Sequence, residues 1–432
     1  MKKQSYQAPR GMHDIIPTDQ PYWQFVYEKG KSLLEEYGFE RIDTPILEST
    51  GLFVRGIGET TEIVEKEMYN LKTKGGDEFS LRPEGTAGMV RAYIEHGMNV
   101  LPHPIQLWTY GQMFRHENPQ SGRLRQLHQL DAEMFGDESY AADAQLILMA
   151  YRLLENIGLK GSVIRINSIG DSACRPQYIK ALKDYFHNRI KKMCSACQAR
   201  FKTNVLRMLD CKGKECKEVA KDAPQIFDYL DPECKKHFKG VLEVLEEANL
   251  PYVLDNNLVR GLDYYTRTVF EIWPEEKEGG REEDLQFSIC AGGRYDKLVE
   301  LLGGPKTPAV GWALGMERVI LLLKKRGIKV PEIGPMPKVF IVQLGDMAKR
   351  KSLVLFEELR KAGITAKISL GRDSIKSQLR IANRFGINYA IIIGQKEALE
   401  NSVILREMDS GVQENIPREK IVEIFKQKIK KR

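Results

Sequence analysis

The segment FRHENPQSGRLRQLHQLDAE, residues Phe114–Glu133, concentrates the side chains most able to do chemistry. It is rich in arginines, including Arg123 and Arg125, and it ends with the carboxylates of Asp131 and Glu133. Guanidinium groups match phosphate oxygens in a forked geometry, whereas carboxylates attract cations. We therefore predict that this segment binds an anionic ligand at one end and a cationic one at the other. A solvent-exposed strand face of mixed charge is the alternative interpretation.

Arg115 lies where an apolar run, PIQLWTYGQM, meets a turn rich in Asn, Pro, Ser and Gly. Beside Glu117 and opposite Arg123, its guanidinium would form one side of a phosphate clamp. Taken alone, Arg115 would more often be a surface cation.

A second segment, LVRGLDYYTRTVFE (residues Leu258–Glu271), is rich in β-forming residues and has a glycine directly after Arg260. A glycine in a strand often marks a close approach of the backbone to another group. Arg260, Asp263, Tyr264 and Tyr265 are therefore candidates for lining a pocket. Ordinary aromatic packing in a strand explains this segment equally well.

Arg318 lies in AVGWALGMERVILLLKK, for which we predict a helix over residues 309–323 that is apolar nearly all round. Such a helix would partly bury Arg318, and buried arginines are rare unless they are paired. A phosphate or a stacked base would satisfy it, as would a carboxylate elsewhere in the fold; we favour the ligand. AGGRYDKL adds flexible glycines beside Arg294 and Tyr295, as expected for a pocket wall.

Five of the seven cysteines lie between Cys194 and Cys234. Their odd number and clustering argue against the disulfide framework of a secreted protein. Cys194-x-x-Cys197 followed by Cys211-x4-Cys216 has spacing compatible with a tetrahedral zinc site. The second pair is loosely spaced and no knuckle-like hairpin is evident, so we favour reduced structural cysteines.

These residues need elements to position them. The turn chemistry within residues 114–133 predicts a β-hairpin. Alternation along its outgoing strand would place Arg123, Arg125, Leu127, Gln129, Asp131 and Glu133 on one face, and Leu124, Gln126, His128, Leu130, Ala132 and Met134 on the other. We also predict helices over 18–37 and 143–157, a helix beginning near residues 84–86, and a mobile loop over 52–70.

At 432 residues the chain exceeds one core and should form two or three domains. A Lys- and Cys-rich, mainly helical insert is predicted from Arg175 to about Gly240. Pro331, Pro335 and Pro337 mark a linker over 331–337. Beyond it, short strands alternate at first with helices, which predicts a small, mostly parallel α/β domain over 338–432.

Composition excludes several classes of protein. No apolar stretch approaches the ~20 residues that a membrane span needs. The sequence starts with a basic dipeptide, but no apolar region follows it, so we predict no signal peptide. We therefore expect a cytoplasmic protein with no membrane partner. A net charge of +7 permits an anionic partner without demanding one. Neither a P-loop nor a GxGxxG fingerprint is present.

Six segments in order resemble the histidyl-tRNA synthetase family of class II aminoacyl-tRNA synthetases, over nearly the whole chain. PRGMHDIIP resembles the family's N-terminal element, TPILEST motif 1, FRHENPQSGRLRQLHQLDAE motif 2 and AVGWALGMERV motif 3. LVRGLDYYTRTVFE and CAGGRYD resemble motifs of the histidine enzymes alone. The resemblance implies an α+β class II catalytic domain over 1–330, an antiparallel sheet with helices, interrupted by the helical insert over 175–240. It also implies a C-terminal α/β anticodon-binding domain over 338–432 and a homodimer formed through motif 1.

The implied reaction joins L-histidine and ATP, with Mg²⁺, into histidyl-adenylate and then transfers the histidyl group to the terminal adenosine of tRNA(His). By resemblance, Glu84 and Thr86 hold the amino group of histidine and Gln129 contacts its reacting end. Glu133 and Tyr265 read the imidazole, and Tyr264 and Tyr295 line the same pocket.

By the same resemblance, Arg115 and Arg260 are the catalytic residues. Arg115 grips the α-phosphate, and Arg260 stabilises charge that develops there. Glu117, Arg123 and Arg318 join Arg115 in binding ATP.

Two alternatives have different chemistry. A non-catalytic, synthetase-like regulatory subunit of histidine biosynthesis would lack the C-terminal domain and lose motif residues that are present here. A class II enzyme for threonine or proline would not carry RGLDYYT. Three departures from the family pattern, Asn118, Leu124 and Lys297, avoid the substrate positions, although Asn118 leaves the contact to the tRNA acceptor stem open.

Overall fold

The computed structural model describes residues 6–120, 122–275, 287–332, 334, 336–371 and 374–430. They form two compact units, Met1–Pro331 and Glu332–Arg432, which are described separately below. No helix among these residues has the length and apolar character to cross a membrane.

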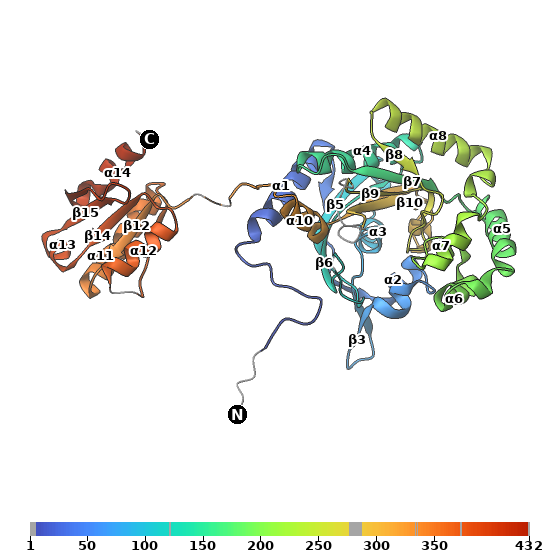
Figure 1. Ribbon diagram of the computed structural model, residues 1–432, viewed down its shortest axis with the longest axis horizontal. Helices are drawn as coiled ribbons and strands as arrows, with labels where there is room; N and C mark the ends of the chain where they lie inside the picture. Colours follow the sequence, from blue (N-terminus) through green and yellow to red (C-terminus); the bar gives the residue numbers. More distant parts are fainter. Residues whose placement is uncertain are drawn as a thin grey trace. The chain divides into compact units, whose positions relative to one another are not determined.

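The first unit is built around a sheet whose eight strands, within the described residues, run in the order β1-β5-β6-β11-β10-β9-β7-β8 (Figure 1). Neighbouring strands from β5 to β7 are antiparallel, and only the edge strands β1 and β8 pair in parallel. The strands are β1 (Glu40–Arg41), β5 (Ile105–Phe114), β6 (Gln126–Phe135), β7 (Val163–Ser168), β8 (Tyr252–Leu254), β9 (Thr266–Trp273), β10 (Cys290–Arg294) and β11 (Ala309–Gly315). The predicted hairpin is confirmed as β5 and β6.

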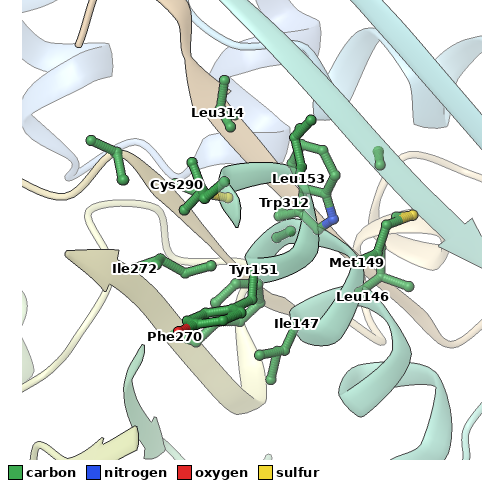
Figure 2. Close-up of a cluster of buried hydrophobic side chains, with 14 of the residues drawn as sticks. Leu146, Ile147, Met149, Tyr151, Leu153, Phe270, Ile272, Cys290, Trp312 and Leu314 are labelled. Atoms are coloured by element: carbon green, nitrogen blue, oxygen red, sulfur yellow. The ribbon is translucent and has the colours of Figure 1, made fainter. Parts of the chain in front are cut away.

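The largest core lies on one face of this sheet. Helix α4 (Tyr140–Asn156) packs side chains such as Leu146 and Leu153 against Phe270 of β9 and Trp312 of β11 (Figure 2). Helices α1 (Gln20–Glu36), α8 (Pro232–Glu247) and α10 (Met316–Lys325) complete this layer. Each fully buried side chain of this kind contributes roughly 1.5–3 kcal/mol, so this layer fixes the strands that carry the site.

The predicted alternation along β6 is confirmed. Leu130, Ala132 and Met134 lie in the largest core, whereas Gln129 and Glu133 line a cavity on the opposite face. The strand begins only at Gln126, so Arg123 and Arg125 belong to the turn rather than to the strand face.

The helical insert is observed where the composition changes. It contains α5 (Arg175–His187), α6 (Ser195–Thr203), α7 (Lys214–Lys221) and the start of α8, joined by short 3₁₀ turns and without strands. Glu62, outside the insert, accepts hydrogen bonds from Arg200 at 2.6 Å and Arg207 at 3.4 Å, which tie the insert to the rest of the unit.

The predicted mobile loop over 52–70 is wrong. This segment contains α2 (Thr50–Ile57), a π-helical turn (Ile63–Glu67) and the start of β3 (Tyr69–Lys72), which joins β2 (Leu47–Ser49) and β4 (Glu78–Leu81) in a small sheet. The loop prediction rested on the Gly, Glu and Thr content of this segment. It is wrong because Phe53 and Ile57 of α2 pack against Ala87 of α3 (Thr86–Glu95). The start of α3 agrees with the prediction.

The predicted helix over 309–323 is also wrong in its first half, because residues 309–315 form strand β11. β11 pairs with β6 and β10 and is buried on both faces, and a doubly buried strand has the same continuous apolar sequence as a buried helix. The prediction of β structure over Leu258–Glu271 is confirmed for residues 266–271, which belong to β9, and is wrong for residues 258–265, which form a loop.

The second unit is an α/β domain with the strand order β13-β12-β14-β15-β16. Its strands are β12 (Val339–Gln343), β13 (Ala366–Ile368), β14 (Tyr389–Ile393), β15 (Ser402–Glu407) and β16 (Gln413–Pro417), and its helices are α11 (Asp346–Lys361), α12 (Ile375–Arg384), α13 (Gln395–Glu400) and α14 (Ile421–Lys430). Only β13, β12 and β14 are parallel, so the sheet is mixed rather than mostly parallel. Pro335, predicted in the linker, lies outside the described residues.

Candidate active site

A cavity of about 300 Å³ opens on the face of the large sheet opposite α4. Its walls come from β6, β9, β10 and β11, the hairpin turn, the start of α3 and the loop before β9. The residues predicted for the site that line it are Glu84, Thr86, Arg115, Glu117, Arg123, Gln129, Glu133, Arg260, Tyr264, Tyr265 and Arg318. Of the predicted set, Tyr295 lies just behind this wall and contacts it through Glu133.

Glu133 is held in the cavity wall by two hydroxyl groups. Its carboxylate accepts hydrogen bonds from the Thr86 hydroxyl at 2.6 Å and from the Tyr295 hydroxyl at 2.5 Å. Gly311 lies directly opposite on β11, where an added Cβ would come within 1.5 Å of Glu133 Oε2. Burial raises the pKa of Glu133 well above its ordinary value. A polar group in this setting favours a ligand that can both donate and accept hydrogen bonds.

Glu84 holds the start of α3. Its carboxylate accepts hydrogen bonds from the backbone N–H groups of Thr86 at 2.9 Å and Ala87 at 2.8 Å, which would otherwise be unpaired at a helix N-terminus. The Tyr264 hydroxyl donates to the same carboxylate at 3.3 Å, and burial raises the pKa of Glu84. Glu84 therefore positions Thr86 and is itself part of the cavity wall.

Arg260 is held by an acidic partner. Its Nη1 donates to Glu271 Oε1 at 2.5 Å, and its guanidinium lies 5.6 Å from the Tyr265 ring centre. Trp273 Nε1 donates to the other oxygen of Glu271 at 3.0 Å. Trp273 and Glu271 therefore hold the Arg260 guanidinium in the cavity wall, although Arg260 itself lies in a loop.

Arg318 is half-buried as predicted, and its partners within the protein are backbone carbonyls rather than a carboxylate. Its Nε and Nη1 donate to the backbone carbonyls of Gly122 at 2.8 Å and Ser288 at 2.7 Å. Burial, followed by repulsion from Arg123 and Arg115, lowers the pKa of Arg318 to about 10, so it remains a cation at neutral pH.

Two arginines of the hairpin, Arg115 and Arg123, line the cavity near Arg318. Arg115 Nε donates to the Pro83 carbonyl at 2.8 Å, and Arg123 Nη1 donates to Glu117 Oε2 at 3.4 Å. With Arg318 these residues form a cationic cluster suited to phosphate oxygens.

Two candidates serve structural roles instead. Arg294, predicted in a pocket wall, is fully buried and pairs with Asp143, on the α4 side of the sheet, and with Asp296 at 3.0 Å. Asp263 accepts a hydrogen bond from Asn204 of the insert at 2.8 Å and does not line the cavity.

Sequence reasoning missed several residues. Asp210 reaches the cavity from the insert, and only the fold brings it there. Glu317 accepts hydrogen bonds from the backbone N–H and ring of His128, which joins α10 to β6.

Asp131 lies on the polar face predicted for β6. Its burial, followed by repulsion from the neighbouring Glu84, raises the pKa of its carboxyl group to about 8.

The four cysteines with zinc-like spacing come together. All four Sγ atoms lie within 4.8 Å of one another; they belong to Cys194, Cys197, Cys211 and Cys216. The loose spacing of the second pair therefore did not prevent a four-sulfur cluster.

Comparison with known proteins agrees with this geometry. A family model described as histidyl-tRNA synthetase matches residues 11–319, and one described as an anticodon binding domain matches residues 338–428. The chain belongs to the histidyl-tRNA synthetase family. This family joins histidine to tRNA(His) with the use of ATP and a divalent metal ion.

Similar histidyl-tRNA synthetases extend over the full chain. The histidine–tRNA ligase of Dehalococcoides mccartyi is 46% identical over 98% of this chain and 100% of its own length. That of Desulforamulus reducens is 43% identical over 97% of this chain and 98% of its own. The apo S. aureus histidyl-tRNA synthetase is 37% identical, with a TM-score of 0.79 over 98% of this chain and 100% of that one. The class II fold expected from the sequence, with a C-terminal anticodon-binding domain, is confirmed.

Proposed function

We propose that this protein activates L-histidine with ATP and transfers the histidyl group to the 3′-terminal adenosine of tRNA(His). The observation that carries the proposal is the buried Glu133, fixed by Thr86 and Tyr295 at one end of a cavity whose other end is lined by arginines. The family membership and the full-length similarity to histidine–tRNA ligases support the same reaction.

Histidine would occupy the end of the cavity that contains Glu133. Glu133 and Tyr265 would bind the imidazole, which can donate and accept hydrogen bonds, and apolar side chains of similar size would leave these buried groups unpaired. Glu84 and Thr86 would hold the amino group, with Tyr264 and Tyr295 enclosing the ring. Gln129, whose Oε1 is buried without a partner among the described residues, would contact the reacting end.

ATP would occupy the arginine end. A carboxylate oxygen of histidine attacks the α-phosphorus, the bond from phosphorus to the bridging oxygen breaks, and pyrophosphate leaves with the electron pair. Arg115 would grip the α-phosphate, and Arg260 would stabilise the charge that develops on it. Glu117, Arg123 and Arg318 would hold the rest of the nucleotide. Positioning and electrostatic stabilisation suffice, without a covalent nucleophile.

The divalent ion would be Mg²⁺. The carboxylates of Glu117 and Glu271 line the cavity and provide the oxygen ligands that Mg²⁺ prefers. When bound with ATP, the ion would neutralise phosphate charge.

The domain at 338–432 would bind the anticodon of tRNA(His), and the catalytic domain over 1–330, with its insert, would form a cytoplasmic homodimer through the TPILEST segment. Exposed Ile46 and Leu47 of that segment are consistent with a covered surface. Sedimentation of the purified protein tests the dimer.

The regulatory-subunit alternative is not favoured. A structure from Bacillus halodurans C, described as an ATP phosphoribosyltransferase regulatory subunit/histidyl-tRNA synthetase, shares the fold at 19% identity and a TM-score of 0.63. The arginines and Glu133 of the cavity are all present here, and a non-catalytic subunit would not need them.

ATP–pyrophosphate exchange with each of the twenty amino acids tests the proposal. We expect exchange with histidine alone. Folded protein that shows no exchange with any amino acid would favour the regulatory subunit instead.

A further inference from the structure

We infer that Cys194, Cys197, Cys211 and Cys216 bind one structural Zn²⁺ that fixes the segment carrying Asp210 against the catalytic cavity. The zinc site stands on the geometry of the cysteines. Its connection to the cavity rests on the proposed function.

The sulfur positions fit a tetrahedral metal site. All four Sγ atoms lie within 4.8 Å of one another, and those of Cys194 and Cys211 are 3.8 Å apart. With a Zn–S bond of ~2.3 Å, tetrahedral geometry separates sulfur atoms by roughly 3.8 Å. Four sulfurs at these mutual separations suit one metal better than two disulfides, whose sulfurs lie ~2.05 Å apart.

The surrounding backbone favours thiolates over thiols. The backbone N–H of Cys194 donates to Cys216 Sγ at 3.3 Å, a contact that orients a metal-bound sulfur and stabilises its charge. Cys194 and Cys197 lie at the start of α6, and Cys216 lies in the first turn of α7. Both helix N-termini therefore direct partial positive charge towards the cluster. A set of four thiolates with tetrahedral spacing selects zinc among common metals.

This part of the insert also needs a cross-link. Helices α6 and α7 have only 9 and 8 residues, and helices of this length are marginal without tertiary packing. The cluster joins α6, α7 and the Cys211 loop at one point, so a metal ion would add a direct link between them to the apolar packing around the cysteines.

The fixed loop reaches the cavity. Asp210 precedes Cys211 directly and lines the cavity together with Arg260 and Glu271. A zinc ion on Cys211 would therefore set the position of a carboxylate beside the cation proposed to act on the α-phosphate. Asp210 would be a positioning residue rather than a catalytic one.

A second cluster, at the boundary of the insert, provides a control. Asp171, Cys174, Asp231 and Cys234 are also within 4.8 Å of one another, but Asp171 already pairs with Arg267 at 3.4 Å. Asp231 accepts from the backbone N–H of Cys234 at 2.7 Å as a helix cap. We therefore expect no metal there.

The first test is the metal content of full-length protein purified without chelators. We expect about one zinc per chain, lost in Cys197→Ser and Cys216→Ser and retained in Cys234→Ser. Zinc near zero, a different metal, fewer than seven free thiols after denaturation, or loss of zinc in Cys234→Ser alone would each overturn the site. If the serine variants do not fold, Co²⁺ exchanged into the wild-type protein decides, because four thiolates give intense tetrahedral d–d and thiolate charge-transfer bands. A spectrum without them would contradict the site.

The second test concerns the cavity. Asp210→Asn should retain zinc yet raise the KM for ATP in pyrophosphate exchange by roughly tenfold, and Asp222→Asn, on the surface of the insert, should change neither. An Asp210 variant with wild-type kinetics would overturn the connection to the cavity while leaving the zinc site in place. Zinc at one per chain with no exchange for any amino acid would contradict the proposed function and not the site.

Discussion

The Thr86 hydroxyl donates a 2.6 Å hydrogen bond to Glu133 Oε1, and 47 positions separate the two residues in the chain. Thr86 begins α3 and Glu133 lies on β6, so this bond joins the small helix to the central sheet at the base of the cavity. This bond and the one from the Tyr295 hydroxyl hold the Glu133 side chain in one position in the cavity wall.

Glu133→Gln should raise the KM for histidine by roughly 10- to 100-fold with a smaller effect on kcat, because a buried polar pocket loses affinity when one partner is mismatched. ATP–pyrophosphate exchange at varied histidine measures this. Glu138→Gln, an exposed position three residues after β6, serves as the control. Unchanged histidine dependence would remove Glu133 from the pocket.

Gly311→Ala should abolish histidine activation. The new Cβ would collide with Glu133 Oε2 and the backbone carbonyl of Ala132, which cannot move without disturbing the strand pair. The free energy of unfolding should fall by about 1–3 kcal/mol. Denaturant unfolding and exchange measure both effects, with Gly51→Ala as the control because its nearest neighbour is 3.8 Å away. Normal activity in Gly311→Ala would contradict this account of the close approach.

Arg260→Ala should lower kcat for adenylate formation by roughly a hundredfold or more while leaving histidine binding largely intact, because its charge would act only on the developing phosphate charge. Calorimetric titration with histidine and single-turnover kinetics separate the two steps. Arg55→Ala, on an exposed position of α2, is the matched variant. If Arg260→Ala activates histidine at the wild-type rate, the catalytic role is wrong.

Asp131 should make stability depend on pH. Burial, then repulsion by Glu84, raises its folded pKa from 3.8 to about 8. The folded state therefore holds a proton that the unfolded state releases, and the stability supplied by that proton declines as pH rises from about 4 to about 8. Asp131→Asn should remove this decline, a change on the order of a few kcal/mol between acidic and alkaline buffer.

Urea unfolding of wild type and Asp131→Asn at pH values spanning this range measures the difference. Asp14→Asn, an exposed substitution of the same type, should leave the pH profile unchanged. Parallel profiles for wild type and Asp131→Asn would show that Asp131 is ionised throughout.

Local pattern predicted much of the fold and the site. Turn chemistry and alternation identified the hairpin and the face of β6 that carries Gln129 and Glu133. Burial of an arginine identified Arg318, although backbone carbonyls supply its partners. The apolar run over residues 309–315 led to the prediction of a helix, but pairing with neighbouring strands makes it strand β11. A strand buried on both faces has no periodicity in its sequence that distinguishes it from a helix.

Long-range placement could not be predicted from local sequence. Asp210 lines the cavity because the fold of the insert places it there. Arg294 does not line the cavity, because it pairs with Asp143 on the α4 side of the sheet. The glycines beside Arg294 in the sequence could not show that this side chain lies outside the cavity wall.

The insert, although contiguous in sequence, is not a removable module. Deleting residues 175–240 would leave Glu62 without Arg200 and Arg207, and it would also take Asp210 out of the cavity wall. A shortened synthetase made by excising this segment would therefore lose part of its catalytic architecture, and any functional minimal version must replace these contacts rather than merely close the gap.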